Sequence, residues 1–150
     1  MKNFILLLII FTTIINCQLN PTKNLSMFER QVELHKYFEN TKLSLDSSIN
    51  HIFILQTDKC GSCTDEVIAF ITSHFTESSE NKIFILSTDV KVISDELKKM
   101  PNSTLLIDTN FELGRNGLSY AEDLYFKFNK KKIESWSFLN HSTIQELTNQ

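Results

Sequence analysis

The sequence has few basic residues and few cysteines, which argues against several classes of protein. Its net charge is −3 at pH 7, with 15 lysines and arginines against 18 acidic residues. Proteins that bind nucleic acids need a strongly basic surface for the phosphates, so this balance argues against that class. The nearest approach to a basic patch is Lys130 to Lys132, three lysines between two apolar runs, which is typical of a solvated hairpin turn. No internal repeat or low-complexity tract is present.

Cysteines are also few, and they are Cys17, Cys60 and Cys63. A closed zinc site needs four ligands, and the histidines show no paired ligand spacing that could complete one. Covalent haem attachment requires a histidine directly after a C-x-x-C, and Thr64 stands there instead. The sequence therefore predicts neither a metal site nor another cofactor.

The first seventeen residues, MKNFILLLIIFTTIINC, read as a targeting segment. One lysine precedes an apolar run from Phe4 to Ile15, which is too short to span a bilayer and has the shape of a signal h-region. No small-x-small cleavage site follows, and the run ends at Cys17. This resembles a bacterial lipoprotein signal, in which that cysteine is lipidated, although Asn16 replaces the small residue usual there. The alternative is an ordinary secretory signal cleaved near Cys17.

These features divide the chain into three parts. We expect residues 1–17 to be a lipoprotein signal peptide, residues 18–25 a polar tether, and residues 26–150 one folded domain. Either interpretation of the leader places the domain outside the cytoplasm, where disulfides are permitted. Lipidation of Cys17 would anchor it to a bacterial membrane, facing the periplasm or the exterior. Cys60 and Cys63 would then remain as a pair.

The domain is expected to begin with an amphipathic helix over residues 26–40. Ser26 and Glu29 have the S-x-x-E spacing of a capping box, which marks a helix start. Apolar and aromatic side chains then recur at helical spacing. The residues that share this face are Phe28, Val32, His35 and Phe38.

Strand and helix patterns alternate in the rest of the domain. Three apolar runs are typical of buried strands, and they cover residues 51–57, 82–90 and 103–108. Helical patterns separate them, one from the C-x-x-C to residue 75 and a short one capped by Ser94. Alternating residues 124–138 predict a β-hairpin, and a short helix should follow from residue 141. Parallel strands with crossover helices, closed by an antiparallel hairpin, make an α/β fold with a mixed sheet.

The C-x-x-C lies between the first buried strand and the helix that follows it, in HIFILQTDKCGSCTDEVIAFI. A helix N-terminus lowers the pKa of a thiol through its free N–H groups and its dipole. Cys60 precedes the helix and is the expected nucleophile, while Cys63 lies one turn further and can resolve a mixed disulfide. The adjacent Lys59 could lower the thiol pKa further. A purely structural disulfide remains an alternative, but so small a loop would stabilise the fold little.

This pattern resembles the thioredoxin-fold superfamily. Residues 103–136 run from a strand ending in Asp108, through an irregular stretch with glycine, to a closing hairpin. That order is similar to the redoxin branch, the peroxiredoxin-like and periplasmic TlpA-like proteins. The resemblance implies a thioredoxin-like three-layer α/β/α sandwich and a redox-active Cys60–Cys63 disulfide. It also implies an exported, membrane-tethered thiol–disulfide oxidoreductase that acts on the thiols and disulfides of exported proteins and needs a redox partner.

Two features of that family are missing, which supports a second hypothesis. The family places a cis-proline before the first hairpin strand, but residues 119–126 read SYAEDLYF, and Pro21 and Pro101 lie elsewhere. The buried acid that thioredoxins carry on the strand before the motif corresponds here to Ile54, and their tryptophan before the first cysteine corresponds to Lys59. The second hypothesis is a degenerate thioredoxin-fold protein that binds a partner without catalysis. A peroxidase fits less well, because the paired cysteines suit exchange better than a lone peroxidatic cysteine.

Overall fold

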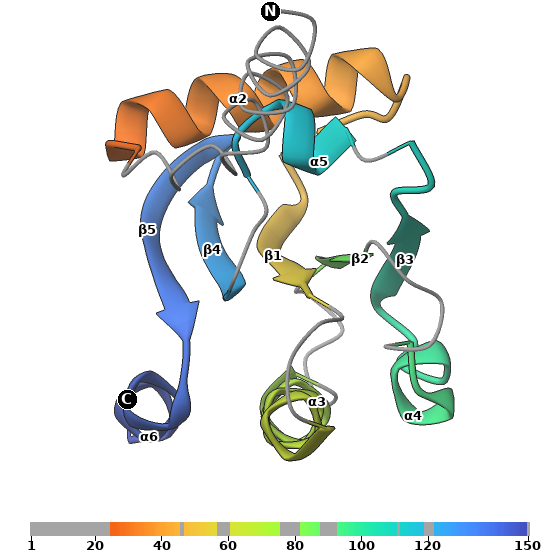
Figure 1. The fold of residues 1–150 in the computed structure, drawn as a ribbon, viewed down its shortest axis with the longest axis vertical. Helices are drawn as coiled ribbons and strands as arrows, with labels where there is room; N and C mark the ends of the chain where they lie inside the picture. The colour runs from red at the N-terminus through yellow and green to blue at the C-terminus, as the bar shows by residue number, and fades with distance from the viewer. Residues whose placement is uncertain are drawn as a thin grey trace, which may run out of the picture.

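The computed structural model describes residues 25–45, 47–56, 61–75, 82–87, 93–110, 112–118 and 122–149, with the backbone alone at 61–63. Within these ranges the chain is an α/β structure on one five-stranded mixed sheet, which confirms the predicted class (Figure 1). In chain order the elements are α2 (Met27–Asn40), β1 (Ile49–Leu55), α3 (Gly61–Phe75), β2 (Lys82–Ser87), α4 (Asp95–Lys98), β3 (Ser103–Ile107), α5 (Glu112–Arg115), β4 (Asp123–Asn129), β5 (Lys132–Leu139) and α6 (His141–Thr148).

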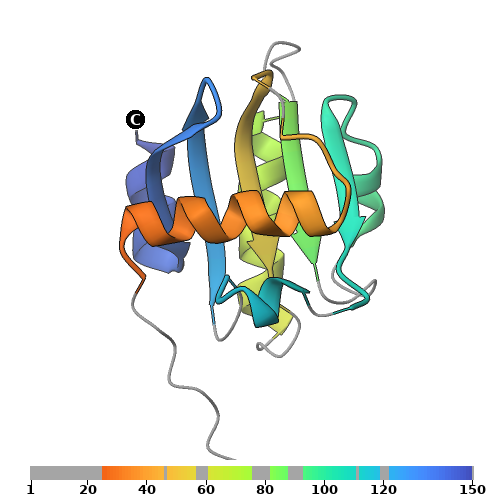
Figure 2. The ribbon, with the colours of Figure 1, turned by 90° about the horizontal axis from the view of Figure 1, so that it is seen from above.

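The sheet has the strand order β3-β2-β1-β4-β5, so β1 lies at its centre. β1, β2 and β3 run parallel to one another, while β4 is antiparallel to β1 and β5 is antiparallel to β4. Helices α2 and α5 cover one face of the sheet, and α3, α4 and α6 cover the other (Figures 1 and 2). No helix in the described ranges is long and apolar enough to cross a membrane.

The central strand is buried on both faces, as its apolar run predicts. Ile52, Phe53 and Ile54 are each 0% exposed. Successive strand residues point to opposite faces, so Phe53 joins the core under α3 while Ile52 and Ile54 join the core under α2. Among the described residues, the members of these two cores lie between positions 34 and 147. The chain after the tether therefore carries its own core, and we expect residues 18–150 to fold without the leader.

The predicted capping box starts helix α2. The hydroxyl of Ser26 accepts the backbone N–H of Glu29 at 3.3 Å, and the Glu29 carboxylate accepts the backbone N–H of Ser26 at 2.8 Å. Both halves of the box are thus present. The box satisfies two backbone donors that the first turn of a helix otherwise leaves without partners.

The face of α2 that packs on the sheet differs from the one that the apolar spacing predicts. The buried residues are Arg30, Leu34, Tyr37 and Phe38, whereas Phe28 is 77% exposed. Arg30 takes the inward position because its guanidinium carbon lies 3.8 Å from the centre of the Trp136 ring, and its Nε donates to the carbonyl of Leu25 at 3.2 Å. A stacked and hydrogen-bonded arginine can replace an apolar side chain at such a site. Of the expected apolar face, only Phe38 is fully buried.

A histidine is buried near the start of β1. His51 is 8% exposed, and its Nδ1 lies 2.9 Å from the hydroxyl of Tyr125 on the paired strand. The ring of Phe75 packs edge-on against it at 4.7 Å between ring centres. Burial, and secondarily the charge of Lys127, lower the pKa of His51 to about 4. His51 is therefore neutral in the folded protein at pH values where an unfolded histidine begins to bind a proton.

Stability should fall on acidification because of His51. An unfolded histidine has a pKa near ~6.5, so below that pH the unfolded chain binds a proton that the folded chain excludes until about pH 4. His51 should thus lower the free energy of unfolding by about 3 kcal/mol between those two values. His51→Gln, which does not titrate, should flatten the urea-unfolding stability curve across that window.

The exposed His141 gives a matched control for this comparison, since His141→Gln should leave the acid-dependent loss in place. The titratable groups that act on the His51 ring are Tyr125, which lies within hydrogen-bond distance, and Lys127, whose charge lowers the pKa of His51 and which pairs with Glu134 at 3.2 Å. Burial raises the pKa of Tyr125 to about 12, so that hydroxyl stays neutral throughout the window. An unchanged pH dependence in the His51→Gln variant would contradict the assignment.

Candidate functional site

The C-x-x-C lies at the junction between β1 and α3. β1 ends at Leu55 and α3 begins at Gly61, so Cys60 immediately precedes the helix and Cys63 is its third residue. Cys17, Lys59 and Cys60 lie outside the described residues, and Cys63 is described by its backbone alone. The bounds of the two elements agree with the predicted position of the motif, between a buried strand and a helix.

Buried polar residues gather at this same edge of the sheet. Gln56 directly follows β1, Ser87 is the last residue of β2, and Asp108 directly follows β3. Asp123 is the first residue of the antiparallel β4, so it lies at the same edge (Figure 2). All four are at most 6% exposed. Sites in open α/β sheets form outside the carboxyl ends of the parallel strands, and this is the edge where the motif begins.

Asp123 connects β4 to the start of the motif segment. Its carboxylate oxygen Oδ1 accepts the backbone N–H of Gln56 at 2.7 Å, and the residue is 1% exposed. The pairing of Leu124 with Ile54 brings the two together. A carboxylate accepting a backbone N–H forms a charge-assisted hydrogen bond, which is stronger than a neutral one. The last described residue before the motif is thus held by a buried acid.

Sequence reasoning missed Asp123, because the acid was expected on β1, where Ile54 stands. The available signal was an aspartate directly before an apolar strand, in the segment SYAEDLYF. That signal identifies Asp123 only when the antiparallel register of β4 against β1 is known, because this register places residue 123 opposite the end of β1. Asp123 and the missing proline therefore belong to the same segment.

Asp108 has a structural role at this edge. Its two carboxylate oxygens accept the backbone N–H groups of Glu112 at 3.0 Å and Leu113 at 2.7 Å, so it caps the start of α5. Its own N–H donates to the carbonyl of Ser87 at 2.8 Å. Burial, with smaller contributions from Asp108 and Glu112, raises the pKa of Tyr37 to about 12. The prediction that a strand ends at Asp108 is confirmed, since β3 ends at Ile107, while the stretch expected to be irregular contains α5.

Within the described ranges, no group of three or more histidine, cysteine, aspartate or glutamate residues could hold a metal ion. Family models, characterised proteins and solved structures give no match to this chain. The features that bear on its function are the C-x-x-C motif, the helix that follows it and the buried polar residues at this edge of the sheet.

Removing the Asp123 carboxylate should destabilise the fold. Asp123→Ala leaves the buried N–H of Gln56 without this acceptor, which should lower the free energy of unfolding by about 1–3 kcal/mol. Asp123→Asn keeps an acceptor oxygen and should cost less. Urea unfolding measures both, and the exposed neighbour Glu122→Ala serves as control. A stability of Asp123→Ala equal to that of the control would show that the bond contributes nothing.

Proposed function

We propose that this chain is an exported, membrane-anchored thiol–disulfide oxidoreductase with a thioredoxin-like fold. Cys60 is its nucleophile and Cys63 its resolving cysteine, and the pair forms a disulfide when oxidised. The observation that carries this proposal is the start of α3 at Gly61, one residue after Cys60. The proposal assigns no metal and no cofactor to the site.

The helix provides the conditions that thiolate chemistry needs. α3 is 15 residues long, and its first turn offers backbone N–H groups and the positive end of the helix dipole. Such an environment lowers the pKa of a nearby thiol. The helix is held rigidly, because Val67, Phe70 and Ile71 are buried in the core beneath the sheet. Lys59 adds a positive charge next to Cys60 in the sequence.

The reaction is a two-step exchange. The Cys60 thiolate attacks one sulfur of a substrate disulfide, so a mixed disulfide forms and one substrate thiolate leaves. The Cys63 thiolate then attacks the Cys60 sulfur, the mixed disulfide breaks, and the second substrate thiolate leaves. The two cysteine thiols lose two electrons and two protons, and the substrate gains both. A dithiol redox partner outside the cytoplasm must then reduce the Cys60–Cys63 disulfide, or the same steps run in reverse as oxidation.

The sheet supports the thioredoxin-like part of the proposal. β1 lies between parallel β2 and antiparallel β4, and helices cover both faces, which agrees with the three-layer arrangement that the family resemblance implies. The acid missing at Ile54 has a counterpart in Asp123, which enters the same edge from β4. We assign Asp123 the role of holding the start of the motif segment.

The second candidate is a thioredoxin-like binding module without catalysis. The absence of proline from the segment SYAEDLYF favours it, since the family uses a proline there to hold substrate peptide. Exchange itself requires only a thiolate, access and geometry, so an intact C-x-x-C at a helix N-terminus favours the enzyme. A disulfide reductase assay separates the two.

The reduced domain, residues 18–150, should reduce the disulfides of insulin when a dithiol recycles it. Cys60→Ser should abolish this activity, because it removes the proposed nucleophile and Cys63 alone cannot close a mixed disulfide into an intramolecular one. Cys63→Ser should instead trap that mixed disulfide, which mass spectrometry detects as an added substrate chain. No turnover by the unchanged domain above that of the dithiol alone would refute the enzyme and favour the binding module, whereas equal turnover of Cys60→Ser would refute Cys60 as the nucleophile.

The full chain expressed in a bacterium should carry lipid on Cys17 as its mature N-terminal residue. Mass analysis of the protein from the membrane fraction should show the loss of residues 1–16 and the added mass of acyl chains. Cys17→Ser should prevent this processing. An unmodified Cys17, or cleavage beyond it, would refute the lipid anchor while leaving the disulfide chemistry untouched.

A further inference from the structure

The exposed apolar side chains of the described chain are grouped on one side of the molecule. The large apolar residues that are exposed are Met27 at 44%, Phe28 at 77% and Phe138 at 37%. Met27 and Phe28 open α2, and Phe138 points to the same face of the sheet because its partner Leu124 belongs to the core under α2. Single exposed apolar residues are ordinary, but a group on one side suggests an interaction surface.

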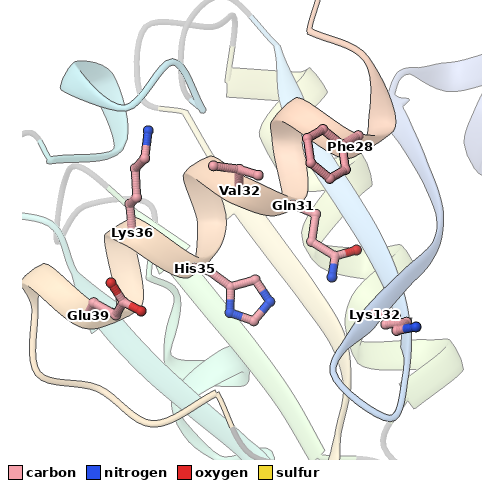
Figure 3. Close-up of a pocket in the computed structure, with 7 residues that line it drawn as sticks. All are labelled: Phe28, Gln31, Val32, His35, Lys36, Glu39 and Lys132. Carbon is pink, nitrogen blue, oxygen red and sulfur yellow. The ribbon is translucent and has the colours of Figure 1, made fainter.

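A shallow groove continues this surface along α2. It has a volume of about 570 Å³ and lies between the outward face of α2 and the β4–β5 turn (Figure 3). Phe28, Val32 and His35 form its wall on α2, and Lys132 lines it from the hairpin. These α2 residues are the ones whose spacing predicts an amphipathic helix. Phe28 does not pack in the core and is exposed to solvent, so this part of the apolar face is available for binding a partner.

Three consecutive lysines lie where β4 turns into β5, and Lys132 among them lines the groove. Lys130 and Lys131 have φ values of 48° and 71°, and Lys132 begins β5. Gln31 ties this turn to α2, because its side chain donates to the carbonyl of Lys131 at 3.5 Å and accepts the N–H of Ile133 at 3.1 Å. None of the three lysines forms an ion pair with an acid in the described part of the chain. Apolar and cationic groups thus occur side by side.

Acidic side chains on α2 only partly offset this charge. Glu29 is engaged in the capping box with Ser26, and Glu33 pairs with Lys36 at 2.7 Å. Glu39 lines the far end of the groove. A surface that combines exposed aromatic residues with a lysine cluster suits the interface of a bilayer that contains anionic lipids.

We propose that this surface, defined by Met27, Phe28, Phe138 and Lys130–Lys132, rests on the anionic bilayer to which the chain is anchored. The proposal builds on the lipidation of Cys17. Phe28 lies eleven residues after Cys17, so a lipid on that cysteine would keep this surface near the bilayer. Tethering at such a distance gives the surface a local concentration in the millimolar range, so a weak contact suffices.

This orientation has a consequence for the proposed chemistry. With the outer face of α2 on the membrane, the layer of α3, α4 and α6 faces away from it (Figure 1). The start of α3 lies at an edge of the sheet, in the layer that would face away from the membrane (Figures 1 and 2). Exported proteins could then reach the cysteines from the side away from the membrane.

The test uses residues 18–150 without lipid, carrying Trp136→Phe so that a new tryptophan is the sole reporter, since the natural chain has one tryptophan. The Phe28→Trp reporter should shift its emission to shorter wavelength with vesicles of phosphatidylglycerol and phosphatidylcholine. The shift should be absent with pure phosphatidylcholine and should weaken in high salt. A Lys99→Trp reporter, on the opposite layer, should not shift with either.

The lysines are tested in the same reporter background. Replacing Lys130, Lys131 and Lys132 with glutamine should weaken binding to the anionic vesicles by roughly 10- to 100-fold. Replacing Lys98 and Lys99 with glutamine is the matched control and should leave it unchanged. Circular dichroism verifies folding, which these exposed positions should not affect.

Several outcomes would overturn the proposal. They are the absence of a shift with anionic vesicles, an equal shift with neutral ones, and equal weakening in the two sets of lysine variants. Sedimentation showing a dimer that Phe28→Ser dissociates would instead assign the surface to a second copy of the chain. The insulin assay on the same variants keeps the tests separate: vesicle binding without reductase activity would refute only the proposed catalysis.

Discussion

The burial of β1 between β2 and β4 is the constraint on which the rest of the structure depends. Ile52, Phe53 and Ile54 contribute to cores on both faces, so the strand cannot slip by one residue without exchanging them. That register determines where the strand ends, and hence where the segment with the C-x-x-C leaves the sheet. The packing of α3 against the same strand then determines where the helix begins. Apolar packing therefore determines the position of any reactive site at this junction.

Local patterns predict much of the fold. The apolar runs and the capping box at Ser26 give the strands and the start of α2, because both depend on residues that are close in sequence. The inward face of α2 could not be predicted in this way. Arg30 is buried there by stacking on Trp136, more than a hundred residues further along the chain. Helical periodicity contains no information about such a partner, so Phe28 was expected with the apolar face and lies in solvent instead.

The candidate site likewise has one feature that the local sequence predicts and one that depends on tertiary contacts. The position of the C-x-x-C between strand and helix follows from the sequence, since both elements are marked by their own residues. The position of Asp123 at this edge could not be predicted from the sequence, because it depends on the pairing of β4 with β1 and on the hydrogen bond to Gln56. The resemblance to thioredoxin-like proteins directed attention to an acid on β1 and a proline before β4. Here a buried acid at this edge comes from β4, through the bond of Asp123 to Gln56.

The reactivity of Cys60 is the point on which the proposed function rests. It is measured most directly as the rate of alkylation by iodoacetamide against pH, in residues 18–150 with Cys63→Ser, where Cys60 is the single thiol. The helix N-terminus and Lys59 should stabilise the thiolate, so the pKa should lie at least about one unit below the free-thiol value near ~8.5. A pKa at or above that value would show that α3 does not activate Cys60, and would contradict the proposed oxidoreductase.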